Sequence, residues 1–222
     1  IPYMCNFIAM NNIQNNLSTL KSNLPERISL VAVSKTKSEN ELLQAYDAGQ
    51  RIFGENKIQE MATKFEALPK DIQWHMIGHV QTNKVKYMAP FVDMIHAVDS
   101  IKLLKEIQKQ ALKNDRVIKC LIQVRIAKEE TKFGIPSNEL KPLLKHAKSF
   151  SNIKIKGLMG MASFTKNKKQ IRNEFKLLAN LFKYHSDLQV LSMGMSGDYL
   201  IAIEEGANMI RVGSKIFGER NY

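Results

Sequence analysis

The chain has 222 residues, 44% of them hydrophobic, which suits a globular protein with a sizeable core and either one large domain or two small ones. No apolar run approaches the ~18 residues that a membrane-spanning helix needs, so we expect no membrane partner. The formal net charge is +12, but 26 of the 33 basic residues are lysines spread over most predicted helices. Because arginine recognises phosphates and bases better than lysine, this pattern favours a solvated basic surface over a nucleic-acid site.

The sequence shows no disulfide or metal framework. Its two cysteines, Cys5 and Cys120, are far apart and lack metal-ligand spacing, which predicts reduced thiols and a cytoplasmic protein. His75 and His79 are four residues apart, but Gly78 and the strand pattern around them argue against a zinc-binding helix. We therefore expect no metal site.

Predicted strands and helices alternate along the chain after an opening helix that runs to about Leu20. The first ten residues are apolar but lack a basic leader and a cleavage site, so we interpret them as the lead-in to this helix. Eight short apolar strands are predicted at residues 28–33, 51–56, 72–79, 93–99, 119–126, 153–159, 190–194 and 209–213. Helices are predicted at residues 39–48, 58–68, 83–89, 101–112, 137–149, 168–184 and 198–206, and from about 214.

Local signals mark where three of these helices begin. Ser38 with Glu41 predicts a capping box, and Ser100 and Ser137 are predicted N-caps. Strands that alternate with helices imply βαβ units and a parallel sheet, and eight such units imply closure. The predicted fold is therefore α/β: a single (β/α)8 TIM barrel with an extra N-terminal helix.

We expect one domain over residues 1–222, because no Pro-, Gly- or Ser-rich linker divides the chain. The alternative architecture is an open doubly wound sheet. The sequence has nothing like the Gly-x-Gly-x-x-Gly turn of that fold.

Polar residues and glycines collect just after the predicted strands, where the loops of a barrel meet at one face. They are Ser34–Thr36, Gly54–Asn56, His75 with Gly78–His79, Met159–Ser163, Ser192–Asp198, and Arg211 with Gly213–Lys215. Lys35 directly follows the first strand, and partial desolvation there would favour a neutral amine that attacks carbonyl groups. The alternative is an ordinary strand-end lysine that reaches into water.

The last two strands both end in glycine and serine where a helix begins, at Gly194–Gly197 and at Gly213–Ser214. Such ends bind phosphate through backbone amides, and phosphate sites in these barrels lie after the seventh and eighth strands. The alternative is ordinary turn and cap chemistry. The occurrence of both loops in these two positions favours phosphate.

A lysine that faces a phosphate site across the barrel mouth fits pyridoxal 5′-phosphate (PLP), a phosphate-bearing aldehyde that forms a Schiff base with lysine. Arg211 lies two residues before the second phosphate loop, near where the pyridine nitrogen would sit. An arginine stays protonated, so it would keep that nitrogen unprotonated and the ring a weak electron sink.

Six motifs occur in order from the first predicted strand to the end of the chain: Val31–Thr36, Phe53–Asn56, Trp74–Lys84, Leu158–Met161, Leu191–Ser196 and Ile210–Arg220. Together they closely resemble the pyridoxal phosphate homeostasis protein family. Gly-Glu-Asn alone is a weak signal, whereas the ordered set is highly specific. The resemblance implies a single barrel like the N-terminal domain of bacterial alanine racemase.

The resemblance also implies roles for individual residues. Lys35 would be the Schiff-base lysine, Asn56 would lie beside the cofactor ring, and Arg211 would face the pyridine nitrogen. Gly197 stands where an acidic residue is common, and Ser214 where threonine is common, whose hydroxyl makes the same bond. The other implied cofactor-binding residues hold the phosphate or line the pocket: Ser196, Gly213, Ser214, His75 and Met195.

Two functions from different classes remain open. In the first, implied by the resemblance, a cytoplasmic monomer holds PLP, buffers it or delivers it to PLP-dependent apoenzymes, and is not an enzyme. In the second, the protein is a PLP-dependent amino-acid racemase. Racemisation needs an acid/base group on each face of the cofactor, and racemases that share this barrel take one from a second, β-rich domain. We expect no such domain here, because the sequence stops at Tyr222, although His75, His79 or a loop tyrosine could substitute.

Overall fold

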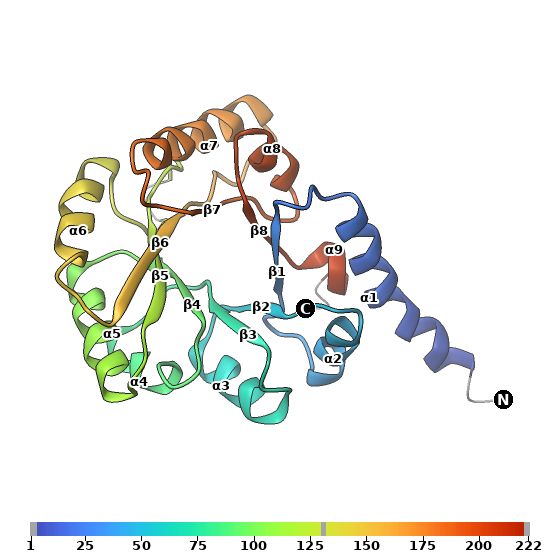
Figure 1. Cartoon of the computed structure of the whole chain (residues 1–222). Helices are drawn as coiled ribbons and strands as arrows, with labels where there is room; N and C mark the ends of the chain where they lie inside the picture. The colour runs from blue at the N-terminus through green and yellow to red at the C-terminus, as the bar shows by residue number, and fades with distance from the viewer. Residues whose placement is uncertain (1–3, 130–131, 220–222) are drawn as a thin grey trace.

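A closed barrel of eight parallel strands forms the centre of the computed structural model, which describes residues 4–129 and 132–219, with side chains described from Asn12 onward (Figure 1). Each strand pairs with the next in chain order, and the pairing of Leu30 with Ile210 joins the first strand to the last. The strands are β1 (Ser29–Val33), β2 (Ile52–Glu55), β3 (Gln73–Met76), β4 (Met94–Val98), β5 (Ile118–Gln123), β6 (Ile153–Met159), β7 (Val190–Ser192) and β8 (Met209–Val212). The prediction of a (β/α)8 TIM barrel is confirmed.

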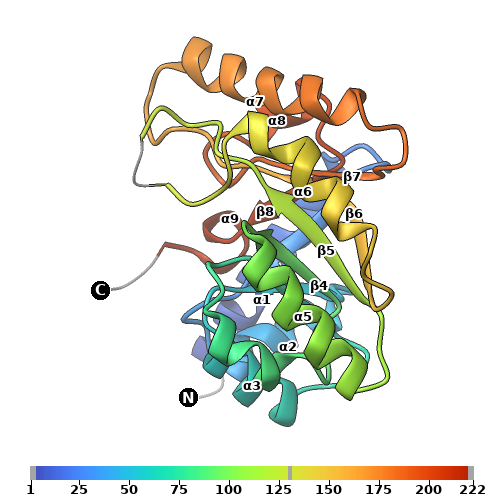
Figure 2. The ribbon, with the colours of Figure 1, turned by 90° about the vertical axis from the view of Figure 1, so that its left-hand side faces the viewer.

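The helices form an outer layer around the barrel, and Figure 2 shows α3, α5, α6 and α7 following one another around the outside of the strands. The extra N-terminal helix, α1 (Met4–Ser22), lies alongside α2 and α9. The others are α2 (Glu39–Asp47), α3 (Ile58–Ala67), α4 (Val85–Met88), α5 (Ile101–Lys113), α6 (Leu140–Ala147), α7 (Lys168–Lys183), α8 (Tyr199–Glu204) and α9 (Ser214–Phe217), with 3₁₀ turns at Thr82–Lys84 and Ser137–Glu139.

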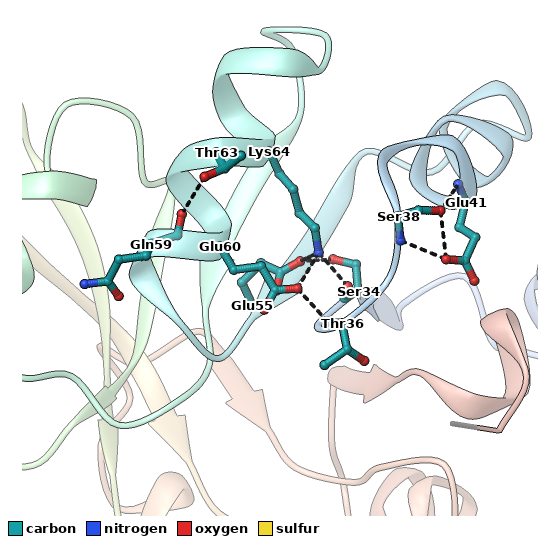
Figure 3. Close-up of polar contacts among 9 residues, drawn as sticks. All are labelled: Ser34, Thr36, Ser38, Glu41, Glu55, Gln59, Glu60, Thr63 and Lys64. Carbon is teal, nitrogen blue, oxygen red and sulfur yellow. Dashed lines mark hydrogen bonds and ion pairs between the residues drawn. The ribbon is translucent and has the colours of Figure 1, made fainter. Parts of the chain in front are cut away.

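Local capping explains where several helices begin. The Ser38 hydroxyl accepts a hydrogen bond from the Glu41 N–H while the Glu41 carboxylate accepts one from the Ser38 N–H, which confirms the capping box (Figure 3). Ser100 caps α5 through the N–H of Leu103, at 3.2 Å. The prediction for Ser137 is wrong, because this residue begins a 3₁₀ turn that takes the place of the first α-helical turn of α6.

The core has two parts because successive side chains of a strand point to opposite faces. Even-numbered residues of β1, such as Leu30 and Ala32, pack outward against the helices, whereas Val31 points into the barrel. A small apolar cluster, which we call the interior plug, fills part of the barrel interior: Val31, Met94, Ala97, Leu121, Met159 and Met209. Because apolar side chains occupy this space, a polar site has to lie beyond them, toward an end of the barrel.

Within the described residues, no helix combines the length and the apolar character that crossing a membrane requires. The side chain of Cys5 lies outside the described part of the chain, as do those of Phe7 and Ile8. Cys120 is a free, buried thiol in β5, and burial raises the pKa of this thiol.

Candidate functional site

A cavity of about 680 Å³ opens at the carboxyl ends of the barrel strands. Its size falls within the range of pockets that hold small-molecule cofactors. Its walls come from the loops after most of the strands, so residues far apart in the sequence meet there. Seven of the eight residues predicted as cofactor-binding line it: Lys35, Asn56, Met195, Ser196, Arg211, Gly213 and Ser214.

The alternation of β1 brings Lys35 to this cavity. Val31 belongs to the interior plug and Val33 lines the cavity, and Lys35 follows in the same phase two residues later. Ser34 is completely buried and lies on the outer side of the strand end. The end of β1 thus directs Lys35 toward the cavity and buries Ser34 on the outer side of the barrel.

Asn56 reaches the cavity from the end of β2, and a close approach of two strand ends keeps it there. A Cβ atom added to Gly78, just after β3, would lie 2.4 Å from the carbonyl oxygen of Asn56. Only glycine allows this approach, because any side chain would displace the backbone of Asn56.

The loops after β7 and β8 meet at one hydrogen bond, in which the Gly213 N–H donates to the Ser196 hydroxyl at 3.2 Å. The loop after β7 is braced by Asp198, whose carboxylate accepts the Met195 N–H at 2.6 Å. Helix α9 begins at Ser214, and first-turn N–H groups have no acceptor within their own helix. This corner therefore offers two hydroxyls and backbone donors to an anion.

Arg211 forms the floor of the cavity and is 3% exposed. Its guanidinium donates to the Ser192 hydroxyl at 2.6 Å and to the Gly160 carbonyl at 3.0 Å. Burial lowers the pKa of Arg211 to about 10, and the nearby Asp198 carboxylate opposes this shift. The side chain therefore keeps its positive charge at neutral pH.

His75 is the one of the eight residues predicted as cofactor-binding that is not among those lining the cavity, and it lies among other buried polar groups. Its side chain, on β3, is 1% exposed. His75 Nδ1 lies 3.0 Å from His96 Nε2, and His75 Nε2 lies 3.4 Å from the Asp93 carboxylate. Asp93 also accepts from Lys119 at 2.9 Å. Because of this burial, His75 contacts the site only through other side chains.

These buried groups form a chain of hydrogen bonds that runs from the cavity floor into the barrel. His96 Nδ1 lies 3.2 Å from the Ser192 hydroxyl, which is the group that Arg211 contacts. Burial lowers the pKa of both histidines, so each is a neutral ring with one donor and one acceptor. A carboxylate only accepts, so His75 donates to Asp93, His96 donates to His75, and Ser192 donates to His96. In every bond of this chain, the donor is therefore the group nearer the Arg211 guanidinium and the acceptor is the group nearer the Asp93 carboxylate.

Sequence reasoning placed Ser192 among the residues at the strand ends but gave it no role, and it missed His96 and Asp93 as parts of the site. A signal was present, since Ser192 and His96 are polar residues within predicted buried strands. A polar side chain on the inward face of a barrel strand needs a hydrogen-bond partner there. That requirement predicts an internal network, although it does not identify the partners.

His79 does line the cavity, at the end of β3. Its ring stacks on Phe133, with centroids 4.1 Å apart and an interplanar angle of 12°. Its Nδ1 atom lies 3.4 Å from the Asp99 carboxylate. These contacts hold a titratable side chain on the side of the mouth formed by β3 and β4.

Comparison with known proteins first shows the broad class of proteins to which this chain belongs. The family model for the alanine racemase N-terminal domain matches residues 8–221. Alanine racemase from Bartonella henselae superimposes with a TM-score of 0.71 at 18% identity, over 96% of this chain and 61% of that one, which shows a shared fold. The barrel and its mouth therefore define a protein of the alanine racemase N-terminal-domain class.

Closer relatives specify the family. A pyridoxal phosphate homeostasis protein of Aquifex aeolicus is 42% identical over 199 residues, 87% of each chain, and a human protein of the same name is 38% identical over 87% of this chain and 77% of its own. The structure of PipY of Synechococcus elongatus with PLP bound has a TM-score of 0.86 at 34% identity and covers 93% of this chain and all of that one. The chain belongs to the pyridoxal phosphate homeostasis protein family.

Proposed function

We propose that the cavity holds PLP as a Schiff base with Lys35 and that the protein acts in intracellular PLP homeostasis and delivery. The observation that carries this proposal is the meeting of a strand-end lysine, a buried arginine and a serine- and glycine-lined anion corner in one cavity. The related PipY protein has been solved with PLP bound, and the curated relatives carry a homeostasis name. Both findings support the assignment.

The residues present fit the chemical groups of PLP. When bound, the cofactor supplies an aldehyde, which condenses with a lysine amine and releases water. The phosphate would fit the corner formed by Ser196, Gly213 and Ser214, which line the cavity and include two hydroxyl groups. Asn56 and Met195 line the cavity between these ends and would contact the ring.

Arg211 bears on whether the protein turns over a substrate. A protonated guanidinium only donates hydrogen bonds, so it would donate to the lone pair of an unprotonated pyridine nitrogen, and its positive charge would disfavour protonation of that nitrogen. The ring is then a weak electron sink, which suits storage better than carbanion chemistry. We accordingly propose that the protein carries PLP without turnover, as a cytoplasmic monomer and single domain over residues 1–222, and passes it to PLP-dependent apoenzymes.

An amino-acid racemase is the second candidate, because the class includes racemases and His79 lines the cavity as a further titratable group. Racemisation needs a proton donor or acceptor on the face opposite Lys35. The PLP-loaded protein incubated with a panel of L- and D-amino acids tests this. Exchange of the α-proton with solvent deuterium would favour the racemase, and its absence from every member would favour the carrier.

The cofactor assignment is tested by visible absorption, borohydride reduction and peptide mass mapping. We expect a yellow protein whose reduced adduct maps to Lys35, and a Lys35→Ala variant that forms no adduct but keeps its fold by circular dichroism. Lys37→Ala is the matched control, since Lys37 lies in the same loop and lines the same cavity. A protein that stays colourless with added PLP, or an adduct on another lysine, would overturn the assignment.

A further inference from the structure

A buried lysine lies on the outer side of the barrel, behind the strand end that carries Lys35. Lys64 of α3 is only 5% exposed. Its ammonium donates to the Ser34 carbonyl at 2.8 Å, to Glu55 at 2.8 Å and to Glu60 at 2.7 Å (Figure 3). An ammonium has three N–H donors, so these contacts use all of them. One side chain thus joins the ends of β1 and β2 to α3.

This cluster holds the backbone on both sides of Lys35. On one side, Ser34 is fixed through its carbonyl by Lys64 and through its hydroxyl by Glu55, at 2.6 Å. On the other side, the Thr36 N–H donates to Glu60 at 2.5 Å. The two residues that flank Lys35 are therefore bound to the same ion-paired group, which we call the Lys64 clamp (Lys64, Glu55 and Glu60).

The clamp also stabilises an unfavourable backbone conformation. Thr36 has φ of 66°, in the left-handed region that β-branched residues rarely adopt. Such conformations persist where surrounding contacts over-determine them, and they concentrate at functional sites. The bond from Thr36 to Glu60 supplies one such contact directly after Lys35.

Stability alone is a weak reason for this arrangement. Taking the charged side chains of Lys64 and Glu55 out of water costs free energy, and a well-packed apolar pair of similar volume is often as stable or more stable. One oxygen of Glu55 is buried without a hydrogen-bond partner, which adds to the cost. The clamp residues do not line the cavity, so any effect that they have on the site is transmitted through the backbone, at residues 34–36 and at Glu55, which directly precedes Asn56.

We infer that Lys64, with Glu55 and Glu60, is a positioning residue that fixes the strand-end backbone so that the Lys35 amine points into the cavity. This inference rests on the proposed role of Lys35. Without the clamp, Thr36 relaxes out of the left-handed region and the Lys35 side chain samples directions away from the aldehyde. Schiff-base formation slows, whereas the phosphate corner on the loops after β7 and β8 stays intact.

Two ligands separate positioning from general damage to the pocket. PLP reports the reaction with Lys35, and its rate of Schiff-base formation is followed by stopped-flow absorbance. Pyridoxamine 5′-phosphate has the same ring and phosphate but an amine in place of the aldehyde, so it reports the pocket without that reaction. The variants are Lys64→Met and Glu60→Ala, and Glu66→Ala, an exposed position of the same helix, is the matched control.

We expect both clamp variants to slow Schiff-base formation at least about tenfold while the Kd for pyridoxamine 5′-phosphate changes less than about threefold. The control should leave both values unchanged. If Lys64→Met does not fold, Glu60→Ala decides, because Glu60 lies near the surface and its replacement leaves the bond between Lys64 and Glu55 in place.

If a clamp variant binds pyridoxamine 5′-phosphate as much more weakly as it reacts more slowly with PLP, the positioning role is overturned. An unchanged rate of Schiff-base formation with PLP would also overturn it. If instead the wild-type protein forms no adduct at Lys35, the proposed function itself fails. The two failures are therefore distinguishable in one set of measurements.

Discussion

At the scale of single residues, the barrel interior contains two neutral histidines between two charged groups. Arg211 lies at the cavity end of the hydrogen-bonded chain and Asp93 at the other. Burial lowers the pKa of His96 well below its usual value, and the nearby His75 and Arg211 act in the same direction. Burial also lowers the pKa of His75, against the opposing effect of Asp93. Protonation of either ring would turn its accepting nitrogen into a second donor, which would then face the donor of the preceding group in the chain.

This arrangement predicts how stability depends on pH. A histidine whose pKa is lower in the folded state than in the unfolded chain binds fewer protons when folded, so acid favours unfolding. The free energy of unfolding should therefore decrease as the pH falls below about 6.5, by up to about 1.4 kcal/mol per pH unit for each ring. Denaturant titrations between pH 8 and pH 5 measure this slope.

A His96→Gln variant should have a shallower slope, because glutamine can form hydrogen bonds but does not titrate. His185→Gln, a partly exposed position after α7, is the control and should leave the slope as in the wild type. An unchanged slope in His96→Gln would show that this ring does not cause the acid sensitivity.

At the scale of elements, α1 packs against the helices that follow the first and last strands of the barrel. It lies alongside α9 and α2, and the Asn16 side-chain amide donates to the Ile216 carbonyl at 3.2 Å. Leu17 is completely buried in this contact. Because α9 begins at Ser214, the N-terminal helix supports the segment that follows the anion corner.

Truncating the side chain of Leu17, which is completely buried, should therefore destabilise the fold. We expect Leu17→Ala to lower the free energy of unfolding by about 3 kcal/mol, as is typical when a buried leucine leaves a cavity. Urea denaturation followed by circular dichroism measures the change. Leu112→Ala is the control, since Leu112 is 64% exposed on α5 and its loss should change stability little. Equal effects of both changes would contradict the packing role of α1.

At the scale of the whole molecule, barrel closure makes the fold depend on contacts between the two ends of the chain. Residues 29–32 pair with residues 209–212, so β1 and β8 form together or not at all. In a closed barrel there is no free sheet edge, because every strand pairs with two neighbours. A subset of the strands would expose such edges, so we do not expect it to be stable alone. Closure thus couples the early and late units of the chain.

We therefore expect residues 1–222 to unfold in one cooperative transition. The single tryptophan, Trp74, is completely buried on β3, so its fluorescence reports the packing of helices on the barrel. Denaturation curves from this fluorescence and from far-UV circular dichroism should coincide. Separate midpoints would show two folding units and contradict a single domain.

The order of the elements and most of the cavity wall could be predicted from the amino-acid sequence. The alternation of short apolar strands with capped helices predicted the barrel, because periodicity and caps are properties of neighbouring residues. The position of Lys35 and Arg211 at strand ends predicted that they meet, because all parallel strands of a barrel present their carboxyl ends at one face. Family resemblance then indicated which strand-end residues would bind the cofactor.

The burial of His75, the hydrogen-bonded chain from Arg211 to Asp93 and the Lys64 clamp could not be predicted in this way. Each depends on side chains from different elements meeting at hydrogen-bond distance, which no local pattern specifies. Lys64 is an extreme case, because its place on an amphipathic helix predicts a solvated side chain. It is buried because the end of β2 places Glu55 within 2.8 Å of its ammonium.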